Sequence, residues 1–505
     1  MGRRILSWKE ISDPIYGYVY FNREIEEKII NTLPLQRLRY ILQLQTAHLV
    51  YPGAVHTRFQ HSLGAMHLAG LMARDYADKL VHLSGEEALG GFDPETLVEA
   101  ARLAGLLHDV GHGPFSHAFE EAILWGRAPP GLSNHELIGM AIVRDLLLPR
   151  IEEAESRLGL PGLSEALLKL LGRDEPREAA LSVMRWTIKG SLYPADVLDF
   201  IRRDSYYAGT SEYGYIAYDK LVRNTYPVVE GGKAYAVLDR SALGELRAYF
   251  VARVNMYERV YYHPVCRAFE RLLKDLLAAI DAELGLLGAV LSMSKGDYGP
   301  FLSLTDAKLY AYLLERTGRG DSVASMASSL LIERKPPWRR VGKEIVLGPH
   351  LGFEAVRAAL NAALTADYAL KASRELEDEI ASRLSSRGVG RDDVWVDFFE
   401  VSPIPKDVLL SPGRSGWLKL RVGRVVGGEV EVADEIDLLT EVMPVEAVVR
   451  AYVRREKYSR DLEGLAARAL EEAIEAVLGF KPGVEGVRAE EVQGAGVPEY
   501  MRITK

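Results

Sequence analysis

The spacing of apolar residues predicts a chain built mostly of helices. Apolar side chains recur at helical intervals over residues 57–79, 94–108 and about 243–287. Asp93 and Pro94 match a helix N-cap followed by proline in the first turn. Further on, Ser133 and Glu136 have the spacing of a capping box. Long amphipathic helices of this kind indicate a helical core.

Strand patterns are confined to short stretches. Residues 8–22 alternate around three tyrosines, and residues 228–237 enclose the Gly231-Gly232 pair typical of a hairpin turn. From Val394 the pattern changes to strands, followed by a helix over 462–478 and a glycine-rich tail over 482–497 that is expected to fray. The predicted fold class is therefore mainly α, with a helical core, a small β-hairpin insertion and a smaller C-terminal α+β region.

A polar break over residues 292–299 suggests a domain boundary. We predict a catalytic core over 1–290, a helical extension with a basic segment over 291–390, and a C-terminal α+β region over 391–505. The 505 residues are 48% hydrophobic, which is enough for a large core and more than one domain.

Composition restricts the function classes. The net charge of −9 argues against a general nucleic-acid coat, although a local basic patch stays compatible with it. A single cysteine, Cys266, excludes a disulfide framework or a thiolate-rich zinc site within one chain, and is expected to be a small buried residue. With no secretory signal at the start and no bilayer-length apolar run, the sequence predicts a cytoplasmic protein without a membrane partner.

Histidines crowd one part of the chain. Nine of the eleven lie between His48 and His135. Among them, His108 and Asp109 stand side by side at the end of an apolar helix, where Gly111, Gly113 and Pro114 break the chain. Neutral imidazole and carboxylate together suit a divalent metal. His61 on the preceding long helix can add a ligand, and either Asp196 or Asp199 can supply a further carboxylate.

The order His61, His108-Asp109, Asp196 resembles the H…HD…D signature of HD-domain metal-dependent phosphohydrolases. The segments 13–17, 36–40, 51–54, 56–64 and 108–117 are similar to the deoxynucleoside triphosphate triphosphohydrolase branch, which includes vertebrate members with a SAM domain. The likeness covers about residues 8–345, and no SAM domain is recognised among these 505 residues.

The resemblance implies that His61, His108, Asp109 and Asp196 bind one divalent metal. Manganese, iron, zinc, nickel, cobalt and magnesium all fit this ligand set, and an additional magnesium ion accompanying the nucleotide stays open. The metal would act on the α-phosphate of a deoxynucleoside triphosphate, releasing a deoxynucleoside and inorganic triphosphate.

Further catalytic and substrate residues follow from the same resemblance. His117 and Glu120 correspond to an acid/base pair, although a surface ion pair is the alternative. Phosphate contacts are implied for Arg58, His112 and His135, where His135 alternatively only begins a helix. Substrate contacts are implied for Gln43, Asp204, Arg253 and Tyr261, with Asp204 otherwise a solvated helix charge; Tyr206, Tyr207 and Tyr262 are weaker candidates that equally suit the core.

The chain also departs from the family pattern. Val197 stands in place of a phosphate-binding lysine, Asn31 in place of a guanine-reading aspartate, and Tyr257 in place of a histidine. Guanine-dependent activation and base preference are therefore open. A regulatory nucleotide site is expected at Gln36, Arg39, Lys335 and Arg339, unless the basic run is simply solvated.

We therefore expect a dNTP triphosphohydrolase that acts on a nucleotide substrate and forms a homo-oligomer, a dimer or a tetramer. Activation by a second nucleotide stays open. One alternative is another HD-type nucleotide phosphatase or phosphodiesterase. Another is a nucleotide-sensing or nucleic-acid-binding protein with a vestigial site.

Overall fold

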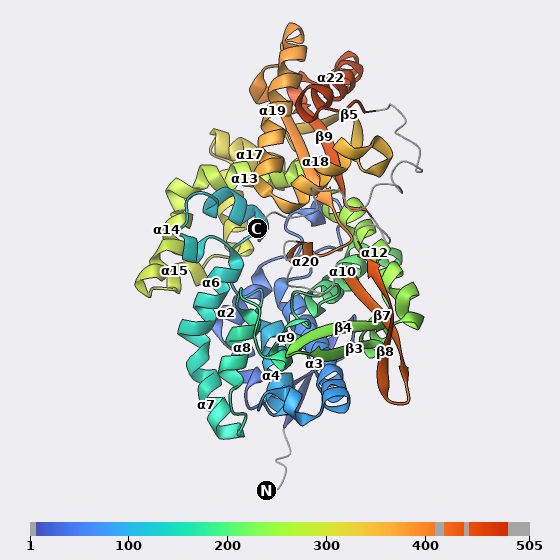
Figure 1. Ribbon diagram of the computed structural model, residues 1–505. Coiled ribbons are helices and arrows are strands. Elements are labelled where there is room, and N and C mark those ends of the chain that lie inside the picture. Colours follow the sequence, from blue (N-terminus) through green and yellow to red (C-terminus); the bar gives the residue numbers. More distant parts are fainter. Residues whose placement is uncertain (1–6, 410–418, 439–443, 483–505) are drawn as a thin grey trace. The chain divides into compact units, whose positions relative to one another are not determined.

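The computed structural model describes residues 7–409, 419–438 and 444–482 (Figure 1). The chain forms two compact units, each made of two segments: unit 1 is Met1–Pro336 with Asp407–Val442, and unit 2 is Pro337–Lys406 with Met443–Lys505. This division differs from the expected boundaries, because residues 291–336 belong to unit 1 instead of a separate extension. The glycine-rich tail lies, from residue 483 on, outside the described residues.

Unit 1 is mainly helical, which confirms the predicted fold class. Its longest helices are the ones that the apolar spacing predicts. The helices are α1 (Glu26–Ile30), α2 (Leu33–Gln36), α3 (Arg58–Ser84), α4 (Pro94–Leu107), α5 (His117–Phe119), α6 (His135–Ile142), α7 (Leu148–Leu158), α8 (Leu163–Leu171), α9 (Ala179–Arg185), α10 (Ala195–Ala208), α11 (Tyr218–Arg223), α12 (Leu243–Met256), α13 (Pro264–Leu284), α14 (Leu286–Leu291), α15 (Gly299–Leu302), α16 (Asp306–Arg316) and α17 (Ser322–Leu331).

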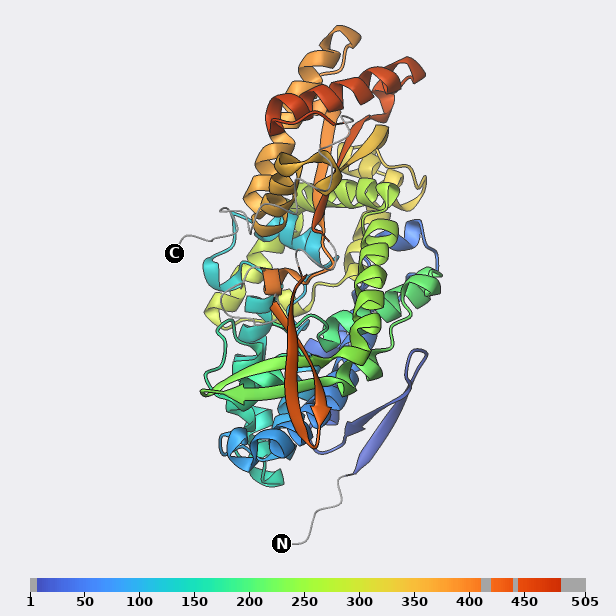
Figure 2. The same cartoon turned by 45° about the vertical axis from the view of Figure 1, so that its right-hand side comes forward.

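Two small sheets accompany these helices. The expected N-terminal hairpin forms an antiparallel pair, β1 (Trp8–Asp13) with β2 (Gly17–Asn22). The second hairpin, β3 (Thr225–Glu230) and β4 (Lys233–Asp239), turns at Gly231 and Gly232, both with positive φ. Figure 2 shows it beside two C-terminal strands, β7 (Lys419–Val426) and β8 (Glu429–Asp437), which complete a sheet of order β3-β4-β7-β8. The predicted C-terminal strands therefore divide between the two units.

Unit 2 is an α+β body. Its antiparallel sheet has the order β5-β9-β6, formed by β5 (Trp338–Leu347), β9 (Glu446–Arg454) and β6 (Val394–Val401). Three helices, α18 (Phe353–Leu364), α19 (Ala366–Leu384) and α22 (Arg460–Leu478), share an apolar core with the sheet. The short helix α20 (Lys406–Leu409) follows the first segment of this unit.

Local sequence signals fix the two helices that carry the histidine-rich site. Thr57 and Gln60 form a reciprocal capping box at the start of α3. The Asp93 side chain accepts a hydrogen bond from the Glu95 amide at the start of α4, as predicted. The cap of α6 was misassigned, because Asn134 and not Ser133 accepts the hydrogen bond from the Leu137 amide.

The close approach of α3 and α4 depends on Gly105. A Cβ atom at this position would lie 2.7 Å from the carbonyl oxygen of Ala65 and 2.9 Å from the Cα of Met66. Both are backbone atoms, so the helices would have to separate. Of the described helices, no single one has the length and apolarity to cross a membrane, although the bent pair 264–284 and 286–295 meets that test jointly.

Replacing Gly105 with alanine should therefore destabilise the protein by about 1–3 kcal/mol, the usual cost of overpacking. The control is Gly244→Ala in α12, where a Cβ would meet nothing within 4 Å. Because alanine restricts the unfolded chain and favours helix, the control should be neutral or slightly stabilising. Urea unfolding measures both; equal stability of the two variants would contradict the packing argument.

Candidate metal centre and catalytic site

The structure brings together the four side chains predicted to bind metal. His61 lies in the first turns of α3, His108 and Asp109 directly follow α4, and Asp196 lies in the first turn of α10. Asp196 Oδ1 is 3.0 Å from His61 Nε2 and 3.4 Å from His108 Nε2. Asp109 Oδ1 is 3.4 Å from His108 Nε2. Three separate helices thus direct nitrogen and oxygen atoms at one point.

The hydrogen bonds of the two imidazoles show that this point suits a cation. His61 Nδ1 lies 2.8 Å from a carboxylate oxygen of Asp199, and His108 Nδ1 lies 2.8 Å from the carbonyl oxygen of Gly105. Since these partners only accept, Nδ1 is the protonated nitrogen of each neutral ring. The two Nε2 lone pairs then face each other at 3.2 Å, which a divalent cation would satisfy.

The charges around this point are also those of a cation site. Burial disfavours the charge of Asp109, but the Arg58 guanidinium and the imidazoles of His108 and His112 hold the pKa of its carboxyl well below the usual range. Burial likewise opposes ionisation of Asp196, and hydrogen bonds with His108 and His61 lower its pKa. Burial lowers the pKa of His61, but its hydrogen bonds with Asp196 and Asp199 raise it to about 10, so the surroundings favour a positive charge at this point.

Asp199, the other carboxylate that the sequence left open, supports the cluster from behind. Besides His61, it accepts hydrogen bonds from Arg203 at 2.9 Å and from the Tyr16 hydroxyl at 2.8 Å. Arg203 continues to Asp13 at 2.8 Å. Gly64 leaves room for this network, because a Cβ there would lie 1.9 Å from Asp199 Oδ1. Sequence reasoning offered Asp199 only as an alternative metal ligand and assigned no role to Arg203, Tyr16 or Asp13.

A second group of imidazoles lies next to the cluster. His112 stacks on His135 with ring centroids 3.9 Å apart, and His117 meets the His112 ring edge-on at 5.1 Å. His112 Nε2 lies 3.2 Å from Asp109 Oδ1, which joins the two groups. The His117 side chain is 56% exposed, so a ligand in solvent can reach it.

Glu120 organises this second group. Its carboxylate accepts hydrogen bonds from the backbone amide of His135 at 2.7 Å and from the Nδ1 of His135 at 2.5 Å. It also lies 3.4 Å from His117 Nδ1. Burial raises the pKa of Glu120, but the hydrogen bonds from His117 and His135 outweigh it and depress that pKa. Burial lowers the pKa of His135, whereas Glu120 raises it above the usual value. The predicted pairing of His117 with Glu120 is present, and His135 is the stronger partner.

The loop between the two groups is held in an uncommon conformation. Phe115 and Ser116 both have positive φ, 55° and 52°. Asp306 of α16 accepts the Phe115 amide at 2.6 Å, and the Ser116 hydroxyl accepts a hydrogen bond from Arg58 at 2.7 Å. Arg58 also pairs with Asp109. The glycines and proline before this loop signalled a chain break, but nothing local signalled Asp306.

Two of the residues predicted to contact the substrate, Asp204 and Tyr261, form a separate group with His56. Asp204 accepts a hydrogen bond from the Tyr261 hydroxyl at 2.7 Å, and its other oxygen lies 2.7 Å from His56 Nε2. The side-chain oxygen of Gln43 is buried and lacks a hydrogen-bond partner among the described residues. Arg253 lies over the Tyr257 ring. His56, which stacks on Tyr207, is the member that sequence reasoning missed.

The four residues expected to form a regulatory site, Gln36, Arg39, Lys335 and Arg339, divide between the two units. In unit 1, Arg39 donates to Gln36 at 2.9 Å and lies over the Phe59 ring. Lys335 belongs to unit 1, whereas Arg339 belongs to β5 of unit 2 and covers the Tyr458 ring. Of the positions that depart from the family pattern, Val197 is buried and Asn31 is exposed. The regulatory assignment stays a prediction.

Comparison with known proteins agrees with this geometry. Residues 58–180 match the model of the HD domain. An uncharacterised protein of Bacillus subtilis, YwfO, is 30% identical over 269 residues, which are 53% of this chain and 55% of that protein. The deoxynucleoside triphosphate triphosphohydrolase SAMHD1 of Bos taurus is 27% identical over 440 residues, 80% of this chain and 71% of that protein. The human protein of the same name is 30% identical over 325 residues, 59% of this chain and 49% of that protein.

A solved structure of a hypothetical protein from Aquifex aeolicus matches with a TM-score of 0.61 and 25% identity, over 92% of this chain and all of that one. The chain thus contains an HD domain, and the resemblance to HD-domain proteins inferred from the sequence is confirmed. Within that class, several curated relatives are dNTP triphosphohydrolases named SAMHD1. The chain spans about half the length of the first two curated relatives, 55% and 48%.

Replacing Asp199 with asparagine should weaken metal binding by about 10–100-fold, because His61 loses the carboxylate that orients it. Competition against a chelator measures the affinity, and circular dichroism identifies a temperature at which the variant is folded. Asp75→Asn is the control, because Asp75 pairs with Lys79 on the same helix α3 without touching the cluster. Unchanged affinity in Asp199→Asn would refute the supporting role.

The Glu120–His135 pair predicts a pH window of stability. Since the pKa of Glu120 is depressed, its contribution to folding stability is fully present above about pH 4.5 and is lost as the pH falls towards the folded-state pKa. Since the pKa of His135 is raised, its contribution is complete below about 6.5 and is lost as the pH rises through the folded value. The stability lost in Glu120→Gln, about 2 kcal/mol, should therefore be largest between these two values.

Urea unfolding of both proteins at several pH values checks this window. Glu121→Gln serves as the control because its partner, Lys274, stays charged throughout the range. A loss in Glu120→Gln that stays constant from pH 5 to pH 9 would count against the pairing.

Proposed function

We propose that this protein hydrolyses deoxynucleoside triphosphates at the α-phosphate, releasing a deoxynucleoside and inorganic triphosphate. The observation that carries the proposal is the convergence of His61, His108, Asp109 and Asp196 beside the imidazoles of His112, His117 and His135. Two neutral imidazoles and two carboxylates leave positions for water and a phosphoryl oxygen. The similarity to proteins named dNTP triphosphohydrolases supports this substrate class.

In this proposal, each group of residues has a distinct task. His61, His108, Asp109 and Asp196 would hold a divalent metal, which when bound would supply Lewis acidity at the α-phosphate and lower the pKa of a water molecule. Arg58, His112 and His135 offer hydrogen-bond donors to the phosphate oxygens, where charge develops. His117, exposed to solvent and held by Glu120, donates a proton to the departing 5′ oxygen.

The sugar is recognised by the separate group around Asp204. The Tyr261 hydroxyl donates a hydrogen bond to Asp204 at 2.7 Å, and the buried side-chain oxygen of Gln43 lacks a hydrogen-bond partner among the described residues. Together they offer acceptors and a donor for a 3′ hydroxyl. A nucleotide bound across the two groups would place its phosphates at the metal and its sugar at Asp204.

The rival chemistries predict different products. Another HD-type phosphatase or phosphodiesterase would release orthophosphate or a nucleoside monophosphate, and a sensor with a vestigial site would release neither. The intact ligand set favours an enzyme over the sensor. Oligomer formation and activation by a second nucleotide at Gln36, Arg39, Lys335 and Arg339 belong to the same proposal.

The test is a panel of dNTPs and NTPs with several divalent metals, with and without a second nucleotide, and with the products separated by chromatography. Wild-type protein should release triphosphate and prefer dNTPs. Asp109→Ala should lower turnover by at least about a hundredfold, because it removes a metal ligand, whereas Asp93→Ala at the α4 cap should keep it. Released monophosphate, or full turnover in Asp109→Ala, would overturn the proposal.

A further inference from the structure

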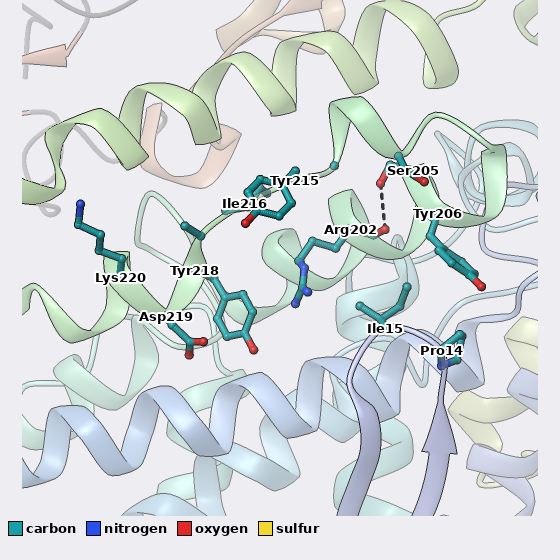
Figure 3. A pocket seen from close by; sticks show the side chains of 13 residues that line it. Pro14, Ile15, Arg202, Ser205, Tyr206, Tyr215, Ile216, Tyr218, Asp219 and Lys220 are labelled. Carbon is teal, nitrogen blue, oxygen red and sulfur yellow. Dashed lines mark hydrogen bonds between the residues drawn. The ribbon is translucent and has the colours of Figure 1, made fainter.

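A pocket in unit 1 is lined by residues that, apart from the weaker substrate candidate Tyr206, have no role in the proposed reaction. It has a volume of about 560 Å³, within the range of small-molecule sites. Three segments line it: the turn at Pro14 and Ile15 between β1 and β2, one face of α10 from Arg202 to Tyr206, and residues 211–220 leading into α11. Figure 3 shows Arg202 extending from α10 between Tyr218 and Ile15.

Arg202 is the charged group at the centre of this pocket. Its guanidinium lies between two aromatic rings, 4.6 Å from the centroid of Tyr218 and 5.1 Å from that of Tyr16. It contacts the Tyr218 hydroxyl, but its Nη1 is buried and makes no hydrogen bond to any described residue. Because two rings already contact the guanidinium, a ligand would bind at its remaining nitrogen edge. A buried donor without a partner is costly, and an oxyanion would satisfy it.

The other charges of the lining leave Arg202 available. Lys220 is already paired with Glu245 at 2.6 Å. Asp219 is a carboxylate at the α11 end of the lining (Figure 3). The pKa of Tyr218 is raised, mainly by burial and secondly by the negative charge of Asp219. An anion would therefore be repelled from the α11 end and attracted to Arg202.

Two exposed aromatic rings border the pocket. Tyr215 is 84% exposed, and Tyr206 is 51% exposed. Large exposed rings beside a cavity are typical of surfaces on which a flat ligand stacks. Gly214 sets the depth, because a Cβ there would lie 1.7 Å from the Ser205 hydroxyl and push the 211–217 segment away from α10.

We propose that this pocket binds an organic anion in which an oxyanion group, phosphate or carboxylate, is attached to a flat ring. The oxyanion pairs with the edge of Arg202, and the ring stacks on Tyr215 or Tyr206. The site is separate from the metal cluster and does not depend on the reaction proposed above. One contact chain joins the two, since Tyr16 stacks on Arg202 and its hydroxyl binds Asp199.

Equilibrium binding to the full-length protein tests the proposal with adenosine 5′-monophosphate as the probe. Arg202→Gln should weaken the site by at least about tenfold, the usual effect of losing a charged hydrogen bond. Arg223→Gln is the control, since it makes the same charge change on an exposed residue of α11 that does not line the pocket. Any binding at the metal cluster is common to both variants, so only the component lost in Arg202→Gln is attributed to the pocket.

Competitors then identify the chemistry. Inorganic phosphate displacing the probe assigns a phosphate ligand, and benzoate displacing it assigns a carboxylate. Tyr215→Ala should weaken the probe by about five-fold or more without affecting displacement by the oxyanion, because it removes only the ring contact. Equal probe affinity in Arg202→Gln and Arg223→Gln, or displacement by neither competitor, would overturn the proposal, and neither result bears on whether triphosphate is released.

Discussion

The buried carboxylate of Asp199 is the interaction on which the site depends. It fixes the protonated nitrogen of His61, so that the other nitrogen faces His108 and Asp196. Burying a carboxylate is expensive unless its oxygens are paired, and here Arg203 and Tyr16 complete the pairing. The same side chains thus satisfy a buried charge and orient a ligand. The helices α3 and α10 are held at a fixed distance as a consequence.

Small residues make that distance short enough. Gly64 lets Asp199 and Arg203 reach the surface of α3, and Gly105 lets α4 approach the same helix from another side. Since each glycine faces backbone or a paired charge, no side chain could be accommodated there by a simple rotation. Three helix segments that are far apart in sequence therefore bring their polar ends to one point, and the second imidazole group is joined to it through His112 and Asp109.

Much of this could be predicted from the sequence, and the limits have physical reasons. Helical periodicity, the Asp93 cap and the Gly-Gly turn identified their elements because these signals are local. The family resemblance identified the histidines and aspartates that converge. Contacts such as Asp306 with the Phe115 amide, or His56 with Asp204, join residues 191 and 148 positions apart and leave no local pattern. Between Asp196 and Asp199 the residue pattern alone could not choose, and only the family resemblance favoured Asp196, because the choice depends on which face of α10 meets His61.

The sheet of unit 1 has a further consequence for the architecture of the chain. Strand β7 pairs in parallel with β4, so a segment near the C-terminus closes an edge that would otherwise expose unpaired backbone groups. Residues 337–406 therefore resemble an insertion within unit 1, and the described residues 444–482 return to the inserted part. Neither unit is a continuous stretch of polypeptide. Synthesis of unit 1 on the ribosome is thus incomplete until strand β8 has emerged, by which point the first segment of unit 2 has also been made.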